Sequence, residues 1–195
     1  PRSARPGSSV LEGLRQVRQA RHGAGLRRRT RAGCRSRGQL RQGAAAACLL
    51  ATSQIDTEED LFIANSDQLI NWLPEHFLTV MDDKNADGGI ITFKATESKW
   101  SFAKVDTDTD LITEVAEKNP ISDNATVGIY WFKRGKDFIV GLEQMISKNI
   151  RVNGEFYVCP VFNQLIEAKK QIYNYPISSM IGLGTPEDLE KYLKS

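Results

Sequence analysis

The feature that most limits what this chain can fold into is an abrupt change of composition after residue 43. The 195 residues carry 26 basic and 24 acidic side chains, a nearly balanced total. Twelve of the basic residues, all arginine, lie in residues 1–43, where Glu12 is the one acid. From Ala44 onward, acids outnumber bases and lysine is the main base. Residues 1–43 have too few apolar side chains to form a core, so we expect a folded domain only in residues 44–195.

Several interpretations fit this arginine-rich segment. We expect it to be disordered or foreign to the folded protein, as a misread frame, an incomplete gene model or a fusion scar would make it. A basic arm that binds nucleic acid through phosphate groups is an alternative, although the segment has no aromatic residue for base stacking. A transit-peptide-like leader is another. Gly23-Ala-Gly25-Leu-Arg27 matches a short phosphate-loop pattern, but no apolar strand precedes it, so we interpret the match as chance.

Strand and helix patterns alternate in residues 44–195 and predict an α/β domain with a mixed, mostly parallel sheet. The predicted strands cover residues 61–65, 90–95, 100–105, 111–117, 126–133 and 171–177. The predicted helices cover residues 69–82, 136–149 and 161–170, and a further one starts with Thr185 as N-cap and Pro186 at its first position.

Cysteine spacing and hydropathy predict the compartment. The three cysteines are widely spaced and show neither a disulfide framework nor zinc-ligand spacing. No apolar stretch reaches the roughly 18 residues of a membrane span. We therefore expect a soluble, cytoplasmic protein with no membrane partner.

The first sign of chemistry is the polar run that begins at Asn65, where a buried strand must end. In open α/β sheets, ligands bind just beyond the carboxyl ends of the strands. Asp67 is well placed there to hold Mg²⁺ on a phosphate group, which predicts metal-assisted chemistry on a phosphorylated substrate. Alternatively, Asp67 is the N-cap of the helix predicted over residues 69–82.

Six short motifs follow one another along the chain. They are Ile63-Ala-Asn-Ser-Asp67-Gln68, Ala86-Asp-Gly-Gly-Ile90, Glu114-Val-Ala-Glu-Lys118, Ala125-Thr-Val-Gly-Ile-Tyr130, Val152-Asn-Gly-Glu-Phe-Tyr-Val158 and Gly182-Leu-Gly-Thr-Pro-Glu-Asp188. Together they resemble the sugar-phosphate nucleotidyltransferase family, the type that includes glucose-1-phosphate thymidylyltransferase, and most closely its capsule- and surface-polysaccharide branch. The resemblance covers about residues 43–194.

The resemblance implies a three-layer α/β/α Rossmann-like nucleotidyltransferase domain. It also implies transfer of a nucleoside monophosphate from a nucleoside triphosphate to a sugar phosphate, or a related phosphate, in the synthesis of polysaccharide precursors. The partners would be the nucleoside triphosphate and the sugar phosphate, with Mg²⁺ as cofactor, and a homo-oligomer is compatible with this function. Catalysis in such a site consists of positioning and charge neutralisation.

The resemblance also assigns roles to individual residues. Asp67 would hold Mg²⁺ between the two phosphates, and Lys118 would place a positive charge on the sugar phosphate. The substrate-binding residues would be Asn65, Gln68, Glu117, Gly128 and Glu155. Among these, the two glutamates would accept hydrogen bonds from sugar hydroxyls, and Gly128 would let the backbone approach the sugar. Alternatively, the glutamates are ordinary surface acids and Gly128 marks a strand bulge.

Two departures from the family pattern limit the expected activity. The Gly-x-Gly-x-Arg and Pro-Lys-Pro loop that would grip the triphosphate should lie far upstream of Asp67, and no such loop occurs there in a strand–helix context. A second metal carboxylate is missing from Val158–Phe162. We therefore expect an N-terminally incomplete domain with weak or no transferase activity. The alternatives are a non-catalytic sugar-phosphate-binding remnant and a nucleic-acid-binding protein that uses the basic arm, although we do not expect nucleic acid as a partner.

Overall fold

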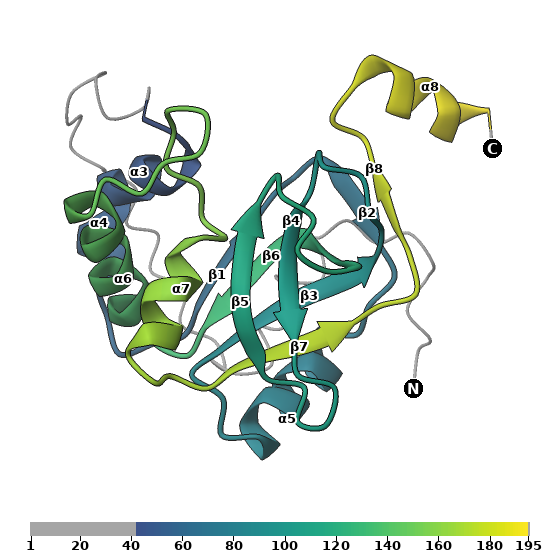
Figure 1. Ribbon diagram of the computed structural model, residues 1–195. Coiled ribbons are helices and arrows are strands. Elements are labelled where there is room, and N and C mark those ends of the chain that lie inside the picture. Colours follow the sequence, from purple (N-terminus) through teal and green to yellow (C-terminus); the bar gives the residue numbers. More distant parts are fainter. Residues whose placement is uncertain (1–41, 195) are drawn as a thin grey trace, which may run out of the picture.

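The computed structural model describes residues 42–194 (Figure 1). The predictions for the arginine-rich segment, namely disorder, a basic arm, a leader and the phosphate-loop match, therefore lie almost wholly outside the described residues. Within residues 42–194, no helix combines the length and the apolar character that crossing a membrane would require.

The described chain consists of short helices followed by strands and helices in mixed order. The helices of the main body are α3 Ala44–Cys48, the 3₁₀ helix η1 Leu49–Ala51, α4 Thr52–Ile55, α5 Pro74–Asp83, α6 Gly135–Ser147 and α7 Val161–Glu167. The strands of the main sheet are β1 Leu61–Ala64, β3 Gly88–Lys94, β4 Ser101–Val105, β5 Ile112–Glu117, β6 Asn124–Phe132 and β7 Ile172–Pro176. A smaller part comprises β2 Gln68–Ile70, β8 Met180–Gly182 and α8 Pro186–Leu193.

The main sheet of residues 42–194 has the strand order β5-β4-β6-β3-β7, and β1 also pairs with β6. β6 runs antiparallel to β1, β3 and β4, and β4 runs antiparallel to β5. Among the described strands of this sheet, β3 and β7 form the one parallel pair. The predicted mixed sheet is confirmed, but the expectation that it is mostly parallel is wrong. The reason is that β6 lies between β1 and β3 and runs opposite to both, so strands of equal direction are not hydrogen-bonded neighbours.

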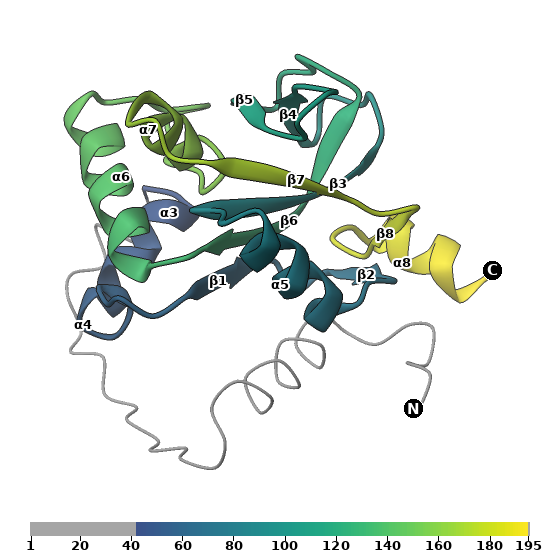
Figure 2. The ribbon, with the colours of Figure 1, turned by 90° about the horizontal axis from the view of Figure 1, so that it is seen from below.

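Alternating side chains of β6 enter two different cores. Tyr130 and Phe132 belong to the core that includes residues of α3, α6 and α7, whereas Ile129 and Trp131 belong to the core beneath α5. This follows from strand geometry, because successive side chains point to opposite faces of a sheet. Figures 1 and 2 show α5 apart from the group formed by α3, α6 and α7. The predicted three-layer α/β/α arrangement is therefore confirmed.

The helix predicted over residues 69–82 starts later than expected. Residues 68–70 form β2, and α5 begins at Pro74 with Leu73 as N-cap. Proline suits the first turn because its missing N–H would have no partner inside the helix. The alternative role of Asp67 as a helix N-cap is therefore wrong. In contrast, the predicted cap of α8 is confirmed, because the Thr185 side chain accepts a hydrogen bond from the backbone N–H of Asp188.

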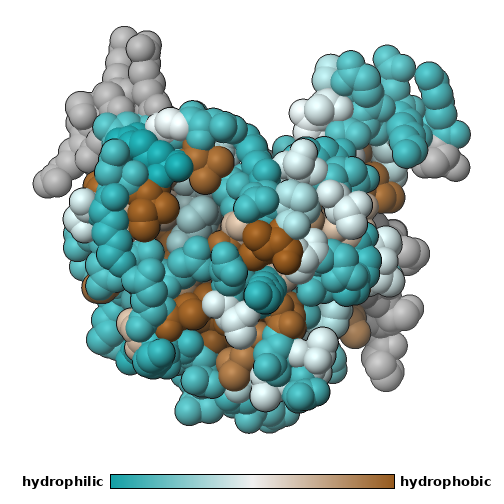
Figure 3. Space-filling model, viewed as in Figure 1, coloured by the Kyte–Doolittle hydropathy of each residue, from teal (hydrophilic) through white to brown (hydrophobic). Residues whose placement is uncertain are grey.

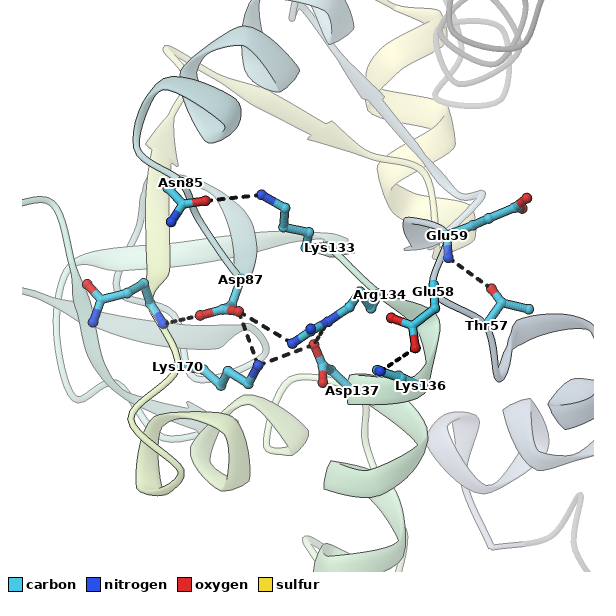
Figure 4. A network of polar contacts seen from close by, with 11 residues as sticks. Thr57, Glu58, Glu59, Asn85, Asp87, Lys133, Arg134, Lys136, Asp137 and Lys170 are labelled. Carbon is cyan, nitrogen blue, oxygen red and sulfur yellow. Dashed lines mark hydrogen bonds and ion pairs between the residues drawn. The ribbon is translucent and has the colours of Figure 1, made fainter.

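An ionic network joins three loops at the end of the sheet opposite Asn65 (Figure 4). Lys170 Nζ lies 3.2 Å from Asp87 Oδ1, and Arg134 Nη2 lies 3.8 Å from the same oxygen. Arg134 Nε also donates to Asp137 Oδ2 at 2.8 Å. These partly buried contacts connect the start of β3, the end of β6 and the start of β7, and so hold the sheet from the side away from the candidate site.

The C-terminal part is attached through β2 and β8. These strands pair antiparallel, with Gln68 opposite Gly182. None of the residues of α8 is buried, and Figure 1 shows the helix standing away from the main body. Figure 3 shows a mainly hydrophilic surface on α8, with the larger apolar patches over the main body. This attachment places the segment between β8 and α8 next to Asp67.

Candidate functional site

Gly128 and Asn65 are in close contact at the carboxyl end of β1. The backbone N–H of Asn65 donates to the carbonyl oxygen of Gly128 at 2.9 Å. Gly128 has a φ of +75°, and a Cβ at this position would lie 2.8 Å from the Asn65 Cγ. The register of β3 against β6 shifts between Ile90 and Thr92, opposite this stretch of β6. Gly128 therefore lies at a strand irregularity, as one interpretation expected, and the group that approaches its backbone is the Asn65 side chain.

Asp67 lies in the turn between β1 and β2, against the segment that leads from β8 to α8. Its carbonyl oxygen accepts a hydrogen bond from the backbone N–H of Leu183 at 2.7 Å. Its carboxylate Oδ2 lies 2.7 Å from the position that a Cβ of Gly184 would take. A glycine at residue 184 thus leaves room for the exposed Asp67 side chain.

Gln68 is a buried polar residue of the site. Its side chain is 6% exposed, and its Nε2 has no hydrogen-bond partner among the described residues. Most buried polar atoms in proteins are paired, since a lost hydrogen bond costs about 1–3 kcal/mol. Gln68 therefore offers an unused N–H donor beside the loop that carries Asp67.

Glu117 ends β5 and is held by Ser101 from the start of β4. The Ser101 hydroxyl donates to Glu117 Oε2 at 2.5 Å, and the two residues are directly paired across the strands. Burial raises the pKa of the Glu117 carboxyl, while the Ser101 hydrogen bond and the charge of Lys118 oppose that rise. The carboxyl is thus oriented by a fixed hydroxyl donor and retains an acceptor oxygen.

Lys118, Tyr157 and Glu155 form a continuous polar chain. Lys118 Nζ donates to the Tyr157 hydroxyl at 3.0 Å, and that hydroxyl donates to Glu155 Oε2 at 2.9 Å. The ammonium also lies 4.9 Å from the centroid of the Tyr157 ring, in cation–π geometry. The hydrogen bond to Tyr157 is the main cause that raises the pKa of Lys118. The structure thus joins two residues that the resemblance assigned to the site through a third that it did not name.

The backbone around this chain is locally constrained. Lys118 has a φ of 55°, in the left-handed region, and its N–H donates to the carbonyl oxygen of Trp100 at 3.0 Å. Asn153 and Gly154 also have positive φ values, 50° and 80°, in the turn that is closed by the Val152–Glu155 bridge. This conformation is typical of an Asn-Gly turn. Both ends of the polar chain therefore start from well-defined turns.

Trp100 connects the two halves of the site. Its carbonyl oxygen binds the N–H of Lys118, and its ring lies 3.5 Å from the position of a Cβ on Gly182. Gly182 is the partner of Gln68 in the smaller sheet. The hydrogen bonds of the described residues do not join Asp67 directly to Lys118, and Trp100 contacts both groups of predicted residues, through its carbonyl oxygen at Lys118 and its ring at Gly182.

The arrangement suits recognition of a polar, anionic molecule. It combines an ammonium, carboxylate acceptors and amide donors, of which Asn65 and Lys118 directly follow the carboxyl ends of β1 and β5. Metal binding by the protein alone is not evident, because residues 42–194 contain no group of three or more His, Cys, Asp or Glu side chains that could hold an ion.

Sequence reasoning missed Tyr157 and Ser101. The available signal for Tyr157 was its place two residues after Glu155 in the Val152–Val158 motif, since residues 156–158 form no strand. Ser101 could be paired with Glu117 only after the register between β4 and β5 was known.

Comparison with solved structures shows what the fold is similar to. The crystal structure of the nucleoside-diphosphate-sugar pyrophosphorylase from Vibrio cholerae RC9 has a TM-score of 0.67 and 23% identity, over 79% of this chain and 66% of that one. A protein assigned as a glucose-1-phosphate thymidylyltransferase from Bacillus anthracis, in complex with sucrose, has a TM-score of 0.59 and 16% identity, over 77% of this chain and 59% of that one. The chain thus spans less than two thirds of either structure. No family model and no curated protein sequence matches it. At these identities the likeness establishes a shared α/β fold.

Proposed function

We propose that this chain is the sugar-phosphate-binding part of a nucleotidyltransferase. The reaction is transfer of a nucleoside monophosphate from a nucleoside triphosphate to a sugar phosphate, as a step in making polysaccharide precursors. The observation that supports it most is the chain Lys118–Tyr157–Glu155, in which an ammonium and a carboxylate are held in one site. The likeness to sugar-nucleotide enzymes supports the same reaction class.

In this proposal the residues orient and neutralise the acceptor. A phosphate oxygen of the sugar phosphate attacks the α-phosphorus, the bond from that phosphorus to the β-phosphate oxygen breaks, and pyrophosphate leaves. Lys118 neutralises the acceptor phosphate, and Glu117 and Glu155 accept hydrogen bonds from sugar hydroxyls. Asn65 at the end of β1 and Gln68 at the start of β2 line the same site, and Gly128 of β6 leaves room for the Asn65 side chain. Such positioning raises the reaction rate, because the acceptor phosphate is already held in the orientation in which it attacks the α-phosphorus.

Mg²⁺ is kept as a separate proposal. Magnesium sites in such enzymes use one or two carboxylates together with substrate phosphates, and Asp67 is exposed and able to be such a ligand. Residues 42–194 contain no group of three or more such side chains, so Asp67 would hold the ion only together with the substrate phosphates. Bound there, the ion would neutralise phosphate charge.

Calorimetry with α-D-glucose 1-phosphate tests the binding part of the proposal. The wild-type protein should bind it, and Lys118→Ala should weaken binding by roughly ten- to a hundredfold, the loss of a charge-assisted hydrogen bond. Lys104→Ala is the matched control, because Lys104 is an exposed lysine on β4, and it should change the affinity less than about twofold. Equal losses in the two variants, or no binding by the wild-type protein, would contradict the proposal.

A non-catalytic binding protein is the second candidate. It is favoured by the Lys118–Tyr157–Glu155 chain, which offers an ammonium and a carboxylate to a sugar phosphate and requires no nucleotide. We expect this chain to bind the sugar phosphate but to release little or no pyrophosphate with UTP, CTP or dTTP. Pyrophosphate release at ordinary enzymatic rates would decide for the transferase and against a binding remnant.

A further inference from the structure

The Tyr157 hydroxyl is the shared partner of two opposite charges. It accepts a hydrogen bond from Lys118 Nζ and donates its own hydrogen to Glu155 Oε2. Lys118 and Glu155 do not form a direct ion pair within residues 42–194. A phenol can occupy this place because it both accepts and donates, which phenylalanine cannot do.

The ring that carries this hydroxyl is held in place. The residues on either side, Phe156 and Val158, are buried, and Tyr157 itself is half-buried. The carbonyl oxygen of Phe156 also accepts a hydrogen bond from the N–H of Ala45 at 3.0 Å. The hydroxyl therefore has a defined position between the ends of two flexible side chains.

Without that hydroxyl, the ammonium and the carboxylate would attract each other. A direct ion pair would use the donor of Lys118 and the acceptor of Glu155 on each other. In either arrangement Lys118 keeps further N–H donors and Glu155 keeps its second oxygen for a ligand, so the hydroxyl changes the distance between the two charged groups and not the number of free donors and acceptors.

We propose that Tyr157 is a positioning residue that keeps Lys118 and Glu155 apart, at a spacing where one ligand engages both. This inference rests on the proposed function and deepens it. The ligand carries its anionic group and a hydroxyl on one rigid framework, so that the spacing of the two protein groups determines affinity.

The first test asks, in the protein without ligand, how strongly the charge of Glu155 acts on Lys118. NMR titration of ¹³Cε-labelled lysine gives the pKa of Lys118, with the signal assigned by Lys118→Arg. The charged or titratable groups that act on this ammonium are Tyr157, Glu117 and Glu155. In the wild-type protein Glu155→Gln should change this pKa little, because Tyr157 stands between. In Tyr157→Phe the same substitution should lower the pKa clearly, because the ammonium has moved onto the carboxylate. Equal effects of Glu155→Gln in both backgrounds would overturn the proposal, whether or not any ligand binds.

The second test compares a ligand that carries both a phosphate and sugar hydroxyls with inorganic phosphate alone. Tyr157→Phe should weaken the binding of α-D-glucose 1-phosphate by about five- to tenfold, while the affinity for inorganic phosphate should change by less than about twofold. The loss should vanish in the Lys118→Ala background. Tyr175→Phe is the matched control, because it removes a tyrosine hydroxyl whose partner is His76, away from the site. If Tyr157→Phe weakened the binding of inorganic phosphate as much as that of glucose 1-phosphate, Tyr157 would not act through spacing.

Two outcomes separate this inference from the proposed function. No binding of glucose 1-phosphate by the wild-type protein, together with the predicted NMR coupling, would remove the proposed function and leave the spacing role. Tyr157→Phe removes one oxygen from a half-buried ring, so folding should persist. If it does not fold, the wild-type background still tests the idea, because a large effect of Glu155→Gln on the Lys118 pKa would contradict it.

Discussion

Replacing Gly128 by alanine combines two separable costs. The first is conformational, because the φ of +75° lies in the left-handed region that residues with a Cβ avoid. The second is steric, because the added methyl group would lie 2.8 Å from the Asn65 Cγ and closer still to its amide nitrogen. We therefore expect Gly128→Ala to weaken the folded state and to displace Asn65 from the end of β1.

The magnitude follows from these two contributions. Left-handed backbone costs a residue with a Cβ about 1–2 kcal/mol. Relieving an overpacked contact adds about 1–3 kcal/mol, less if Asn65 can rotate toward solvent. The free energy of unfolding should therefore fall by about 2–5 kcal/mol, a large fraction of the stability of a domain of this size.

Gly154→Ala isolates the first contribution. Gly154 has a φ of +80°, and a Cβ there would meet nothing within 4 Å. Urea unfolding followed by circular dichroism should show a loss of about 1–2 kcal/mol for Gly154→Ala and a larger loss for Gly128→Ala. Asn65→Ala should recover the excess when it is combined with Gly128→Ala. Equal losses in the two glycine variants, or no recovery by Asn65→Ala, would refute the steric argument.

Three further predictions concern titration, the ionic network and thiol access. Burial raises the pKa of Glu117 above its ordinary 4.5, so this carboxyl stabilises the folded state below pH 4.5 and loses that contribution as the pH rises through the raised pKa. The unfolding free energy of the wild-type protein, measured relative to that of Glu117→Gln, should therefore fall over this pH range. Asp87→Ala removes the carboxylate bound by Lys170 and should lower the unfolding free energy by about 1–3 kcal/mol, whereas Glu190→Ala, which breaks an exposed pair, should change it by less than about 0.5 kcal/mol; comparable losses in urea unfolding would contradict this. Burial raises the pKa of the Cys159 thiol, so iodoacetamide should label it only after denaturation, and mass spectrometry that found it labelled in the folded protein would disprove its burial.

The layers of the fold were accessible from local patterns, whereas strand directions were not. The nearly continuous run of apolar residues along Asn124–Phe132 already implies a strand buried on both faces. Nothing in that local pattern says that β6 runs between β1 and β3 in the opposite direction. Similarly, helical spacing after Leu69 suggested one long helix, but hydrogen bonding to β8 holds residues 68–70 as a strand, and Pro74 starts the helix. Tertiary pairing overrode the local preference in both cases.

The candidate site divides in the same way. Motif order alone singled out Asn65, Asp67, Glu117, Lys118 and Glu155, and short polar runs at the ends of strands are visible in a sequence. Which of these side chains share a partner depends on contacts between residues far apart in the chain. Lys118 and Glu155 are 37 positions apart, and the Tyr157 hydroxyl joins them through bonds at 3.0 and 2.9 Å.

The sequence by itself determined the α/β class, and it predicted which part of the chain folds and which residue types form the site, because hydrophobic period, charge and turn chemistry are local properties. Only the tertiary structure decided the antiparallel pairing of β6, the contact of Gly128 with Asn65 and the bridging role of Tyr157. Each of these depends on the register and approach of distant segments. Backbone hydrogen bonds and close packing set that register and approach, and neither is written in any one stretch of the chain.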